Sequence, residues 1–487
     1  MGVNDPRPRR TAGPPAPSGG PRAKASESRE PVGARARSAR AGGGADLQPP
    51  RSLLPARPSK APRRGHALEE RFREDPSAHD GEGGGSAPRQ RRAFATYGGP
   101  VTTAGEPGEA RALGELWDVD PGLARALTHG FHSYAGRMHP SIARAAVARY
   151  SRPRDTVVDP FCGSGTVLVE SMGLGRSAVG IDASPLGVAI AQVRTNLLGA
   201  EGRATLVAEA TRIAEASGEN ARKRRRPEVP AWGKREFERF FPHVAFELFG
   251  LRALVMETPG KSGVGQALRL CLSSILVKVM RAGPEAPRDG ADKRIGRGVP
   301  SRLLVDRATE LARGLAALEK RTPAGTPTPR IELGDARALP VEPGTARLVL
   351  SSPPYAGTYD YAAQHDVRFA WLELPRRKFE STQMGARKVD GSSFGADPVE
   401  WPKAQAAWMR EVARVLMPGG HALLVVGDGI VGDVAEDAPS AVAAVAEPVG
   451  LRPVARASQT RHMMDRRLRA LFGEQPRCEH LLLLRKI

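Results

Sequence analysis

The chain has 487 residues, enough for two or three domains, and carries a formal net charge of +20. Its cysteines, Cys162, Cys271 and Cys478, lack C-x-x-C spacing, which argues against a disulfide framework or a structural zinc site and favours a reducing compartment. No apolar run reaches the ~18 residues that a membrane span needs. We therefore expect a cytoplasmic protein without a bound metal ion or a membrane partner, and its oligomeric state stays open.

The basic charge is concentrated in two parts of the chain. Residues 1–110 contain 19 basic and 12 acidic residues, and residues 197–330 contain 25 and 15. The remaining residues are close to neutral. A near-neutral body with two basic appendages is typical of a catalytic unit joined to parts that bind a polyanion.

The N-terminal segment, residues 1–110, is dominated by Pro, Gly, Ala, Ser and Arg. Its apolar residues are too sparse to repay the entropy of folding, so we predict a disordered tail. The tail is either merely solvated or makes weak, nonspecific nucleic-acid contacts. Ordered structure is expected from about residue 112, with helical spacing over 113–127 and a helix over 141–150 that Pro140 can begin.

The stretch 156–170 predicts a strand, a glycine-rich turn and the first part of a helix. β-Branched residues open it, and Gly163 and Gly165 allow a sharp turn that leaves helix N–H groups free to face a ligand. The turn lacks the Lys of a phosphate-binding P-loop, which argues against a triphosphate site. A second strand over 177–181 and a helix over 185–196 follow.

The strand–helix alternation stops at residue 197 and resumes at 330. Residues 197–330 are predicted to be a mainly helical insertion, with helices over 246–256, 264–280 and 302–320. The rest is expected to hold strands over 330–334, 346–351, 421–426, 451–457 and 480–485, helices over 361–374 and 401–416, and a loop over 375–397. This order predicts an α/β fold with a doubly wound sheet.

Three acidic residues fall at the carboxyl ends of predicted strands, where ligands bind in doubly wound sheets. They are Asp159, Asp182 and Asp335. An acidic residue after the second strand is placed to accept hydrogen bonds from ribose hydroxyls, and Asp335 could accept one from an adenine amine. Together they predict a pocket for a nucleoside.

A fourth feature, Ser351-Ser-Pro-Pro-Tyr355, ends the strand over 346–351. The Pro pair removes two backbone donors and holds the chain extended, so carbonyl oxygens there remain available as acceptors. Ser352 and the Pro353 carbonyl could bind the hydrogens of a base amine and aim its lone pair at an electrophile. Tyr355 could stack on a base swung out of its helix. The alternative is a rigid turn with a core tyrosine.

These motifs together resemble the S-adenosylmethionine-dependent amino-methyltransferases that act on DNA at cytosine N4 or adenine N6. The resemblance covers residues 131–196 and 331–487 and implies a Rossmann-like methyltransferase sheet that binds S-adenosylmethionine. It rests on Tyr134-Ala-Gly-Arg-Met-His-Pro140, Asp159-Pro-Phe-Cys-Gly-Ser-Gly165, Gly180-Ile-Asp182, Gly334-Asp335, Ser352-Pro-Pro-Tyr355 and Arg414-Val-Leu-Met-Pro-Gly-Gly420. The implied cofactor-binding residues are Tyr134, Arg137, His139, Asp159, Pro160, Phe161, Gly163, Ser164, Gly165, Thr166, Asp182 and Asp335.

The resemblance also implies a catalytic role for Ser352, Pro353, Pro354 and Tyr355. The initial Ser favours cytosine N4 over adenine N6, since the family's adenine enzymes more often begin this motif with Asp or Asn. The implied activity is DNA methylation, as in restriction-modification systems. The alternatives are an RNA base methyltransferase, acting at guanine N2 or similar, and a noncatalytic nucleic-acid-binding protein that retains the fold.

The basic insertion separates the cofactor motifs from the catalytic tetrapeptide, the place of a target-recognition region in this family. Candidate contacts to nucleic acid lie where cations alternate with aromatics. They are Arg222, Lys223, Arg224, Arg225, Arg226 and Trp232. Alternatively, the aromatics form the insertion's core and the basic run is a solvated loop. The predicted domains are thus a tail (1–110), two methyltransferase halves (111–196 and 331–487) and the insertion (197–330).

Overall fold

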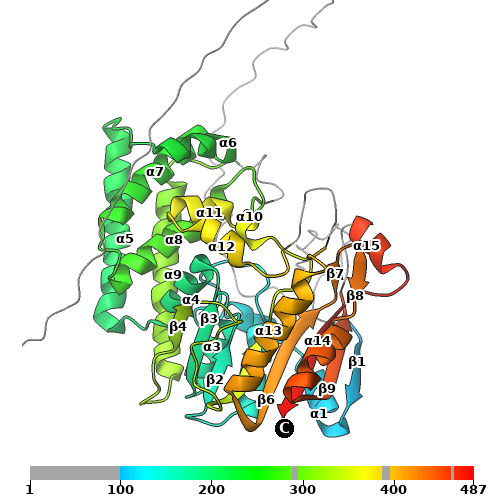
Figure 1. Cartoon of the computed structure of the whole chain (residues 1–487). Helices are drawn as coiled ribbons and strands as arrows, with labels where there is room; N and C mark the ends of the chain where they lie inside the picture. Colours follow the sequence, from blue (N-terminus) through cyan, green and yellow to red (C-terminus); the bar gives the residue numbers. More distant parts are fainter. Residues whose placement is uncertain (1–98, 288–293, 387–394, 462–465) are drawn as a thin grey trace, which may run out of the picture. The chain divides into compact units, whose positions relative to one another are not determined.

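The computed structural model describes residues 99–287, 294–386, 395–461 and 466–487. Eight strands form one sheet in the order β1-β9-β10-β6-β5-β2-β3-β4. The strands are β1 Val101–Gly105, β2 Thr156–Asp159, β3 Ser177–Asp182, β4 Arg330–Leu333, β5 Ala346–Ser351, β6 Leu416–Gly427, β9 Leu451–Thr460 and β10 Cys478–Lys486. The predicted doubly wound α/β fold is confirmed (Figure 1).

The five strands β4, β3, β2, β5 and β6 are parallel neighbours, whereas β10 runs antiparallel between β6 and β9. Strand order reverses between β2 and β5: from β2 the chain moves outward to β3 and β4, then returns to β5 on the other side. A crevice forms at the carboxyl ends of the strands where such an order reverses. The fold therefore brings Asp159 and the tetrapeptide after Ser351 to neighbouring strand ends.

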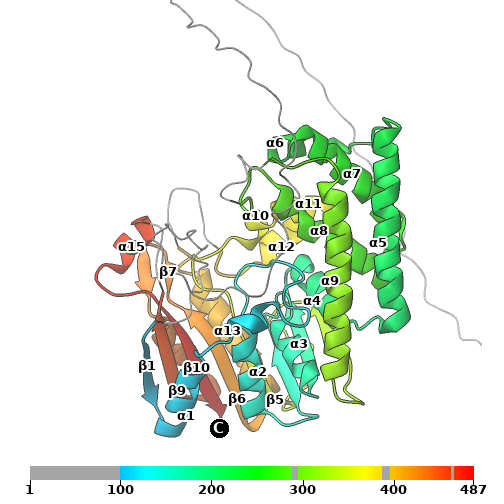
Figure 2. The same ribbon diagram turned by 180° about the vertical axis from the view of Figure 1, so that it is seen from behind.

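Alternate side chains of each strand enter two different cores, as the pleat requires. Val157 packs with helices α1 (Pro107–Glu115), α2 (Pro140–Tyr150) and α3 (Thr166–Gly173). Val158 faces the opposite core, which α13 (Glu400–Val415) and α14 (Ala438–Ala446) cover. Figure 2 shows the first helical layer from behind. Because both faces are covered, the central strands are apolar throughout.

A separate helical part stands beside the sheet and has its own core. It contains α5 Gly199–Arg222, α6 Glu236–Arg239, α7 Pro242–Glu257, α8 Gly263–Val279 and α9 Val299–Arg321. Later helices join that core although they follow the tetrapeptide in sequence: α10 Tyr361–Gln364, α11 Asp366–Trp371 and α12 Arg376–Thr382. The helical part is thus not confined to the predicted insertion.

The structure corrects several predicted boundaries. Order begins with β1 rather than near residue 112, because this short polar strand is stabilised by pairing with β9, a partner more than 300 residues away. The helix predicted over 113–127 is wrong: α1 ends at Glu115, and a 3-10 helix, η1 (Pro121–Arg125), begins at a proline. Residues 1–98 of the predicted tail lie outside the described residues.

The prediction missed α5 and placed a loop where α12 lies. Only a narrow stripe of α5 is buried, at Leu206, Ala210, Ile213 and Ser217, so its apolar signal in the sequence is weak. The prediction also missed α14 and the hairpin of β7 (Gly429–Val431) and β8 (Val434–Glu436). The helix expected over 185–196 is present as α4 (Pro185–Thr195). None of the helices in the described ranges is long and apolar enough to cross a membrane.

Candidate active site

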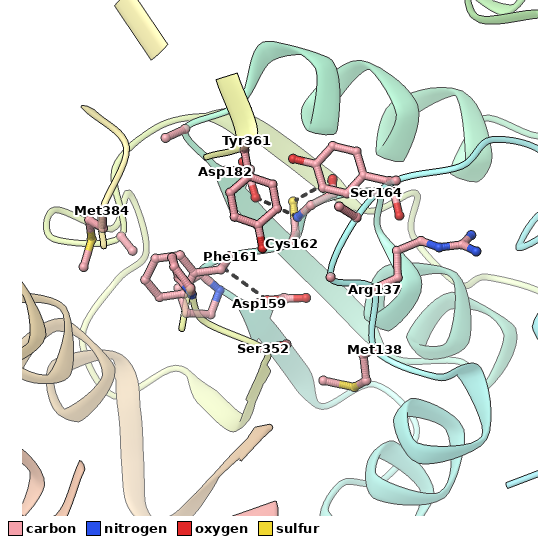
Figure 3. A pocket seen from close by; sticks show the side chains of 18 of the residues that line it. Arg137, Met138, Asp159, Phe161, Cys162, Ser164, Asp182, Ser352, Tyr361 and Met384 are labelled. Atoms are coloured by element: carbon pink, nitrogen blue, oxygen red, sulfur yellow. Dashed lines mark hydrogen bonds between the residues drawn. The ribbon is translucent and has the colours of Figure 1, made fainter. Parts of the chain in front are cut away.

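A pocket lies at the carboxyl ends of β2, β3 and β5, at the strand-order reversal (Figure 3). Most of the predicted cofactor residues line it, together with two residues of the tetrapeptide. The predicted residues in its lining are Tyr134, Arg137, Asp159, Pro160, Phe161, Gly163, Ser164, Thr166, Asp182, Asp335, Ser352 and Pro354. Segments far apart in the sequence therefore converge on one cavity.

Asp159 follows β2 and is 3% exposed. Its Oδ1 accepts hydrogen bonds from the Ser351 hydroxyl at 2.6 Å and from the Phe161 N–H at 3.2 Å. Burial raises the pKa of Asp159 to about 7, against the opposing effect of these hydrogen bonds. Both contacts end on one oxygen, which leaves Oδ2 available to a donor in the pocket.

Asp182 follows β3 and holds the glycine turn. Its Oδ2 accepts from the Gly163 N–H and its Oδ1 from the Ser184 N–H, both at 2.7 Å. Gly163 and Gly165 have φ angles of 46° and 80°, a left-handed conformation that glycine adopts without strain. Burial raises the pKa of Asp182 to about 6.

Asp335 follows β4 and differs from the other two carboxylates. It is about one-third exposed, and Arg337 donates to both of its oxygens at 2.6–3.0 Å. Burial alone would raise the pKa of Asp335, but the hydrogen bonds from Arg337 outweigh it and lower the pKa. Its carboxylate thus stays ionised and is partly exposed to solvent.

The segment upstream of α2 forms another wall. The Tyr134 ring stacks on His365 and Tyr361, with centroids 4.9 and 6.3 Å apart, and a Cβ at Gly163 would lie 3.2 Å from it. Arg137 lines the pocket but directs its guanidinium away from it (Figure 3), where Nη1 donates to the His129 carbonyl at 2.6 Å. A charge contact from Arg137 to the cofactor therefore needs a rearrangement.

Two further predicted cofactor residues lie outside the pocket lining. The His139 Nδ1 accepts from the Ser141 N–H at 3.2 Å and caps α2. Gly165 caps α3, and a Cβ there would lie 2.8 Å from that of Ala191, so it is needed for close packing of α3 and α4. Both residues shape the elements around the pocket.

The tetrapeptide divides between the pocket and the sheet. Ser352 and Pro354 line the pocket, whereas Pro353 and Tyr355 do not. The Tyr355 hydroxyl donates to Glu479 Oε1 at 2.7 Å and lies 3.4 Å from the Ser352 hydroxyl. In this conformation the tyrosine is anchored to β10.

A buried polar chain supports the glycine turn from below. Arg194 of α4 is fully buried and donates to the Ser164 carbonyl at 2.5 Å and to His129 Nδ1. His129 Nε2 lies 2.8 Å from Glu170, which also pairs with Arg321 of α9 at 2.5 Å. Burial lowers the pKa of His129 to about 4, so this ring is neutral. The chain links the turn to the last helix of the insertion.

The basic residues and the tryptophan of the predicted nucleic-acid interface lie in different surroundings. Arg222 to Arg226 are exposed at the end of α5. The Trp232 ring packs against Phe249 and Trp371 in the helical core, with Arg252 over it. This corrects the expectation that Trp232 stacks on a base, because neighbouring rings and a guanidinium already cover it.

Sequence reasoning missed one wall of the pocket. Tyr361 of α10 and four residues of α12 and the loop after it complete the lining: Phe379, Thr382, Gln383 and Met384. The apolar residues Phe379 and Met384, in a segment predicted to be a loop, could have indicated that this segment packs against the pocket. Gln383 and Met384 follow the missed helix α12, so the wall could not be placed without it.

Comparison with known proteins agrees with this geometry. Residues 109–192 match the family described as DNA methylase of the N6/N4 type. The matched segment contains the upstream wall, the glycine turn and Asp182. Over this segment the chain is similar to the DNA amino-methyltransferases. The methyl donor of this family is S-adenosylmethionine, and the predicted resemblance is confirmed.

The matches to individual proteins cover a short stretch of the chain or have low sequence identity. The type II methyltransferase M.MjaII of Methanocaldococcus jannaschii is 41% identical over 66 residues, 14% of this chain and 12% of that protein. The chain thus matches about an eighth of that relative's length. The rRNA methyltransferase aviRa of Streptomyces viridochromogenes is 14% identical, with 76% and 94% of the two chains covered and a TM-score of 0.31. TrmN of Thermus thermophilus is 12% identical, with 74% and 52% covered and a TM-score of 0.29.

The pocket's chemistry fits S-adenosylmethionine. The cofactor carries an ammonium group, a sulfonium, two ribose hydroxyls and an adenine amine, all of which suit acceptors or negative charge. Asp159, Asp182 and Asp335 supply three carboxylates at successive strand ends. Phe161 and Met384 supply apolar surface for a planar ring. The two raised pKa values are those of carboxylates that a cationic ligand would return to the charged form.

Proposed function

We propose that the protein methylates an exocyclic amine of DNA, with cytosine N4 as the preferred target over adenine N6. The observation that carries the proposal is the position of Ser352 and Pro354 in the same pocket lining as Asp159 and Asp182. The acceptors of the tetrapeptide thus stand beside the groups that suit the cofactor. The match of residues 109–192 to the N6/N4 methylases supports DNA as the substrate, which fits the cytoplasmic location predicted from the sequence.

A base amine is a poor nucleophile because its lone pair is delocalised into the ring. In the proposed reaction the Ser352 hydroxyl oxygen and the Pro353 carbonyl accept the two amine hydrogens. This contact favours a tetrahedral nitrogen and directs its lone pair into the pocket. S-Adenosylmethionine, which Asp159, Asp182 and Phe161 would hold, would supply an electrophilic methyl group, and the methylated nitrogen would release one proton to solvent. The protein's contribution is acceptor placement and orientation.

The five basic residues at the end of α5 suit the DNA backbone in this proposal. They are exposed at the last residue of α5 and in the turn after it, and the Phe246 ring near them is covered by Arg226, so they would meet phosphates rather than bases. The helical part would then position the duplex, and base choice would lie elsewhere.

The test is methyl transfer from labelled S-adenosylmethionine to unmethylated DNA, followed by digestion to nucleosides. We expect the label in N4-methylcytosine. Label in N6-methyladenine would keep the reaction and correct the base. Label in RNA alone would overturn the proposal in favour of an RNA methyltransferase, and cofactor binding without any product would favour a noncatalytic nucleic-acid-binding protein.

A further inference from the structure

A cross-strand pair holds the tyrosine of the tetrapeptide. Gly427 of β6 and Glu479 of β10 lie directly opposite each other in the antiparallel ladder. A Cβ at Gly427 would lie 2.7 Å from two carbons of the Tyr355 ring, so only glycine leaves room for the ring there. Glu479 receives the tyrosine hydroxyl at 2.7 Å. One pair thus fixes both the ring and its oxygen.

Glu479 is itself fixed, and its two oxygens have different partners. Arg461 of the loop after β9 donates from Nε and Nη2 to Oε2 at 3.0 and 2.8 Å. Oε1 accepts from Tyr355. A carboxylate paired with an arginine has no hydrogen to give, so the direction of the second bond is set: Tyr355 donates and Glu479 accepts.

This direction determines what Ser352 can do. A tyrosine hydroxyl has one hydrogen, and here Glu479 receives it. In the 3.4 Å contact between the two hydroxyls, Ser352 must therefore be the donor. A hydrogen bond in this contact directs the Ser352 hydrogen toward Tyr355 and leaves the lone pairs of Ser352 for another group. The contact is long, but such contacts in ligand-free sites often shorten when the substrate binds.

We propose that Glu479 is a positioning residue that makes Ser352 a hydrogen-bond acceptor. The inference rests on the proposed function, in which Ser352 must accept a hydrogen from the target amine. A serine hydroxyl could otherwise offer its hydrogen to the amine nitrogen and occupy the lone pair that attacks. The hydrogen bonds from Tyr355 to Glu479 and from Ser352 to Tyr355 prevent Ser352 from donating to the amine nitrogen.

Glu479→Gln tests the direction of the hydrogen bonds at constant shape. Arg461 requires an oxygen, so the amide turns its oxygen to Arg461 and its NH2 to Tyr355. Tyr355 then donates to Ser352, and Ser352 loses its fixed acceptor role. We expect kcat with unmethylated DNA to fall about tenfold, the value of one charge-assisted hydrogen bond. The KM for S-adenosylmethionine should stay within about twofold, since Glu479 does not line the pocket.

The control lies between α1 and α2. There Glu109 accepts from the Tyr150 hydroxyl at 2.8 Å and pairs with Arg149 at 3.3 Å, the same three residue types, with both partners on one carboxylate oxygen, Oε2. Glu109→Gln should leave kcat unchanged. A shared loss in both variants would indicate a general structural effect and overturn the proposal.

Tyr355→Phe provides the second variant. Without the tyrosine oxygen, Glu479 can no longer act on Ser352, so adding Glu479→Gln should change kcat by less than about twofold. Multiplicative losses in the double variant, or wild-type kcat in Glu479→Gln alone, would overturn the proposal while the proposed function stands. No transfer to DNA by the wild type would overturn both.

Discussion

The strand-end pocket and the helical part differ in how their buried charges are paired. In the pocket, Asp159 and Asp182 are held at the ends of buried strands, and burial raises the pKa of each. In the helical part, mostly aliphatic and aromatic side chains fill the interior, and the buried Arg368 of α11 is paired with Glu285. The buried charge of the helical part is therefore paired within the chain, whereas Asp159 and Asp182 accept hydrogen bonds from neutral groups.

This difference indicates which carboxylates would contribute to the binding free energy of a cationic ligand. The pKa of Asp159 is raised from 3.8 to about 7, which corresponds to a burial cost on the order of 4 kcal/mol for the ionised form. A cationic ligand recovers such a cost on binding, because opposite charge favours the ionised carboxylate. A bound cation would therefore stabilise the carboxylates of the pocket, whereas the buried Arg368 of the helical part is already paired with Glu285.

The largest expected effect comes from breaking the buried chain under the pocket. Arg194→Met leaves the Ser164 carbonyl and His129 Nδ1 without their buried donor and should lower the free energy of unfolding by about 3–5 kcal/mol. Urea denaturation measures it. The control is Arg212→Met in α5, where the ion pair with Glu209 is exposed and should contribute less than about 1 kcal/mol. Equal losses would contradict the contrast between the two regions.

The next effect separates catalysis from cofactor binding within the pocket. Tyr355→Ala should lower kcat about a hundredfold, because the tetrapeptide loses its anchor to Glu479. S-Adenosylmethionine affinity, measured by calorimetry, should stay within about twofold, since Tyr355 does not line the pocket. A matching loss of affinity would show that the tyrosine supports the cofactor instead.

A pH titration of cofactor affinity sharpens the charge argument. The folded pKa of Asp159 lies near 7, above that of the free side chain, so its negative charge is lost as the pH falls through 7. S-Adenosylmethionine should bind about tenfold more weakly at pH 6 than at pH 8. Asp159→Asn should flatten this profile, whereas Asp335→Asn should not, because Arg337 keeps the pKa of Asp335 low. A flat wild-type profile would contradict the role of Asp159.

The smallest expected effect concerns the exposed run of the helical part. Replacing Arg222, Lys223, Arg224, Arg225 and Arg226 with Ala should weaken DNA binding severalfold at low salt and reduce its salt dependence. The kcat at saturating DNA should not change. Arg152→Ala and Arg410→Ala, two exposed arginines outside this run, serve as the control. An unchanged salt dependence would exclude the run from the interface.

How far the sequence predicts each region follows from the range of the interactions that build it. The glycine turn and its strands are local, since Val157, Gly163 and Asp182 act within one strand–helix–strand unit. The Gly427–Glu479 pair could not be predicted, because it exists only through the register of β6 and β10. The sequence could not decide whether Trp232 is a core residue or stacks on a base, because its neighbour Trp371 follows the tetrapeptide in the sequence.

The most direct test of the central claim compares the nucleosides of plasmid DNA propagated with the wild-type gene and with Ser352→Ala, in a host without amino-methyltransferases. Mass spectrometry of the digest should show N4-methylcytosine with the wild type and a loss of about a hundredfold or more with Ser352→Ala. Equal amounts of methylated base from both genes, or none from the wild type, would contradict a site in which Ser352 presents a DNA amine to S-adenosylmethionine.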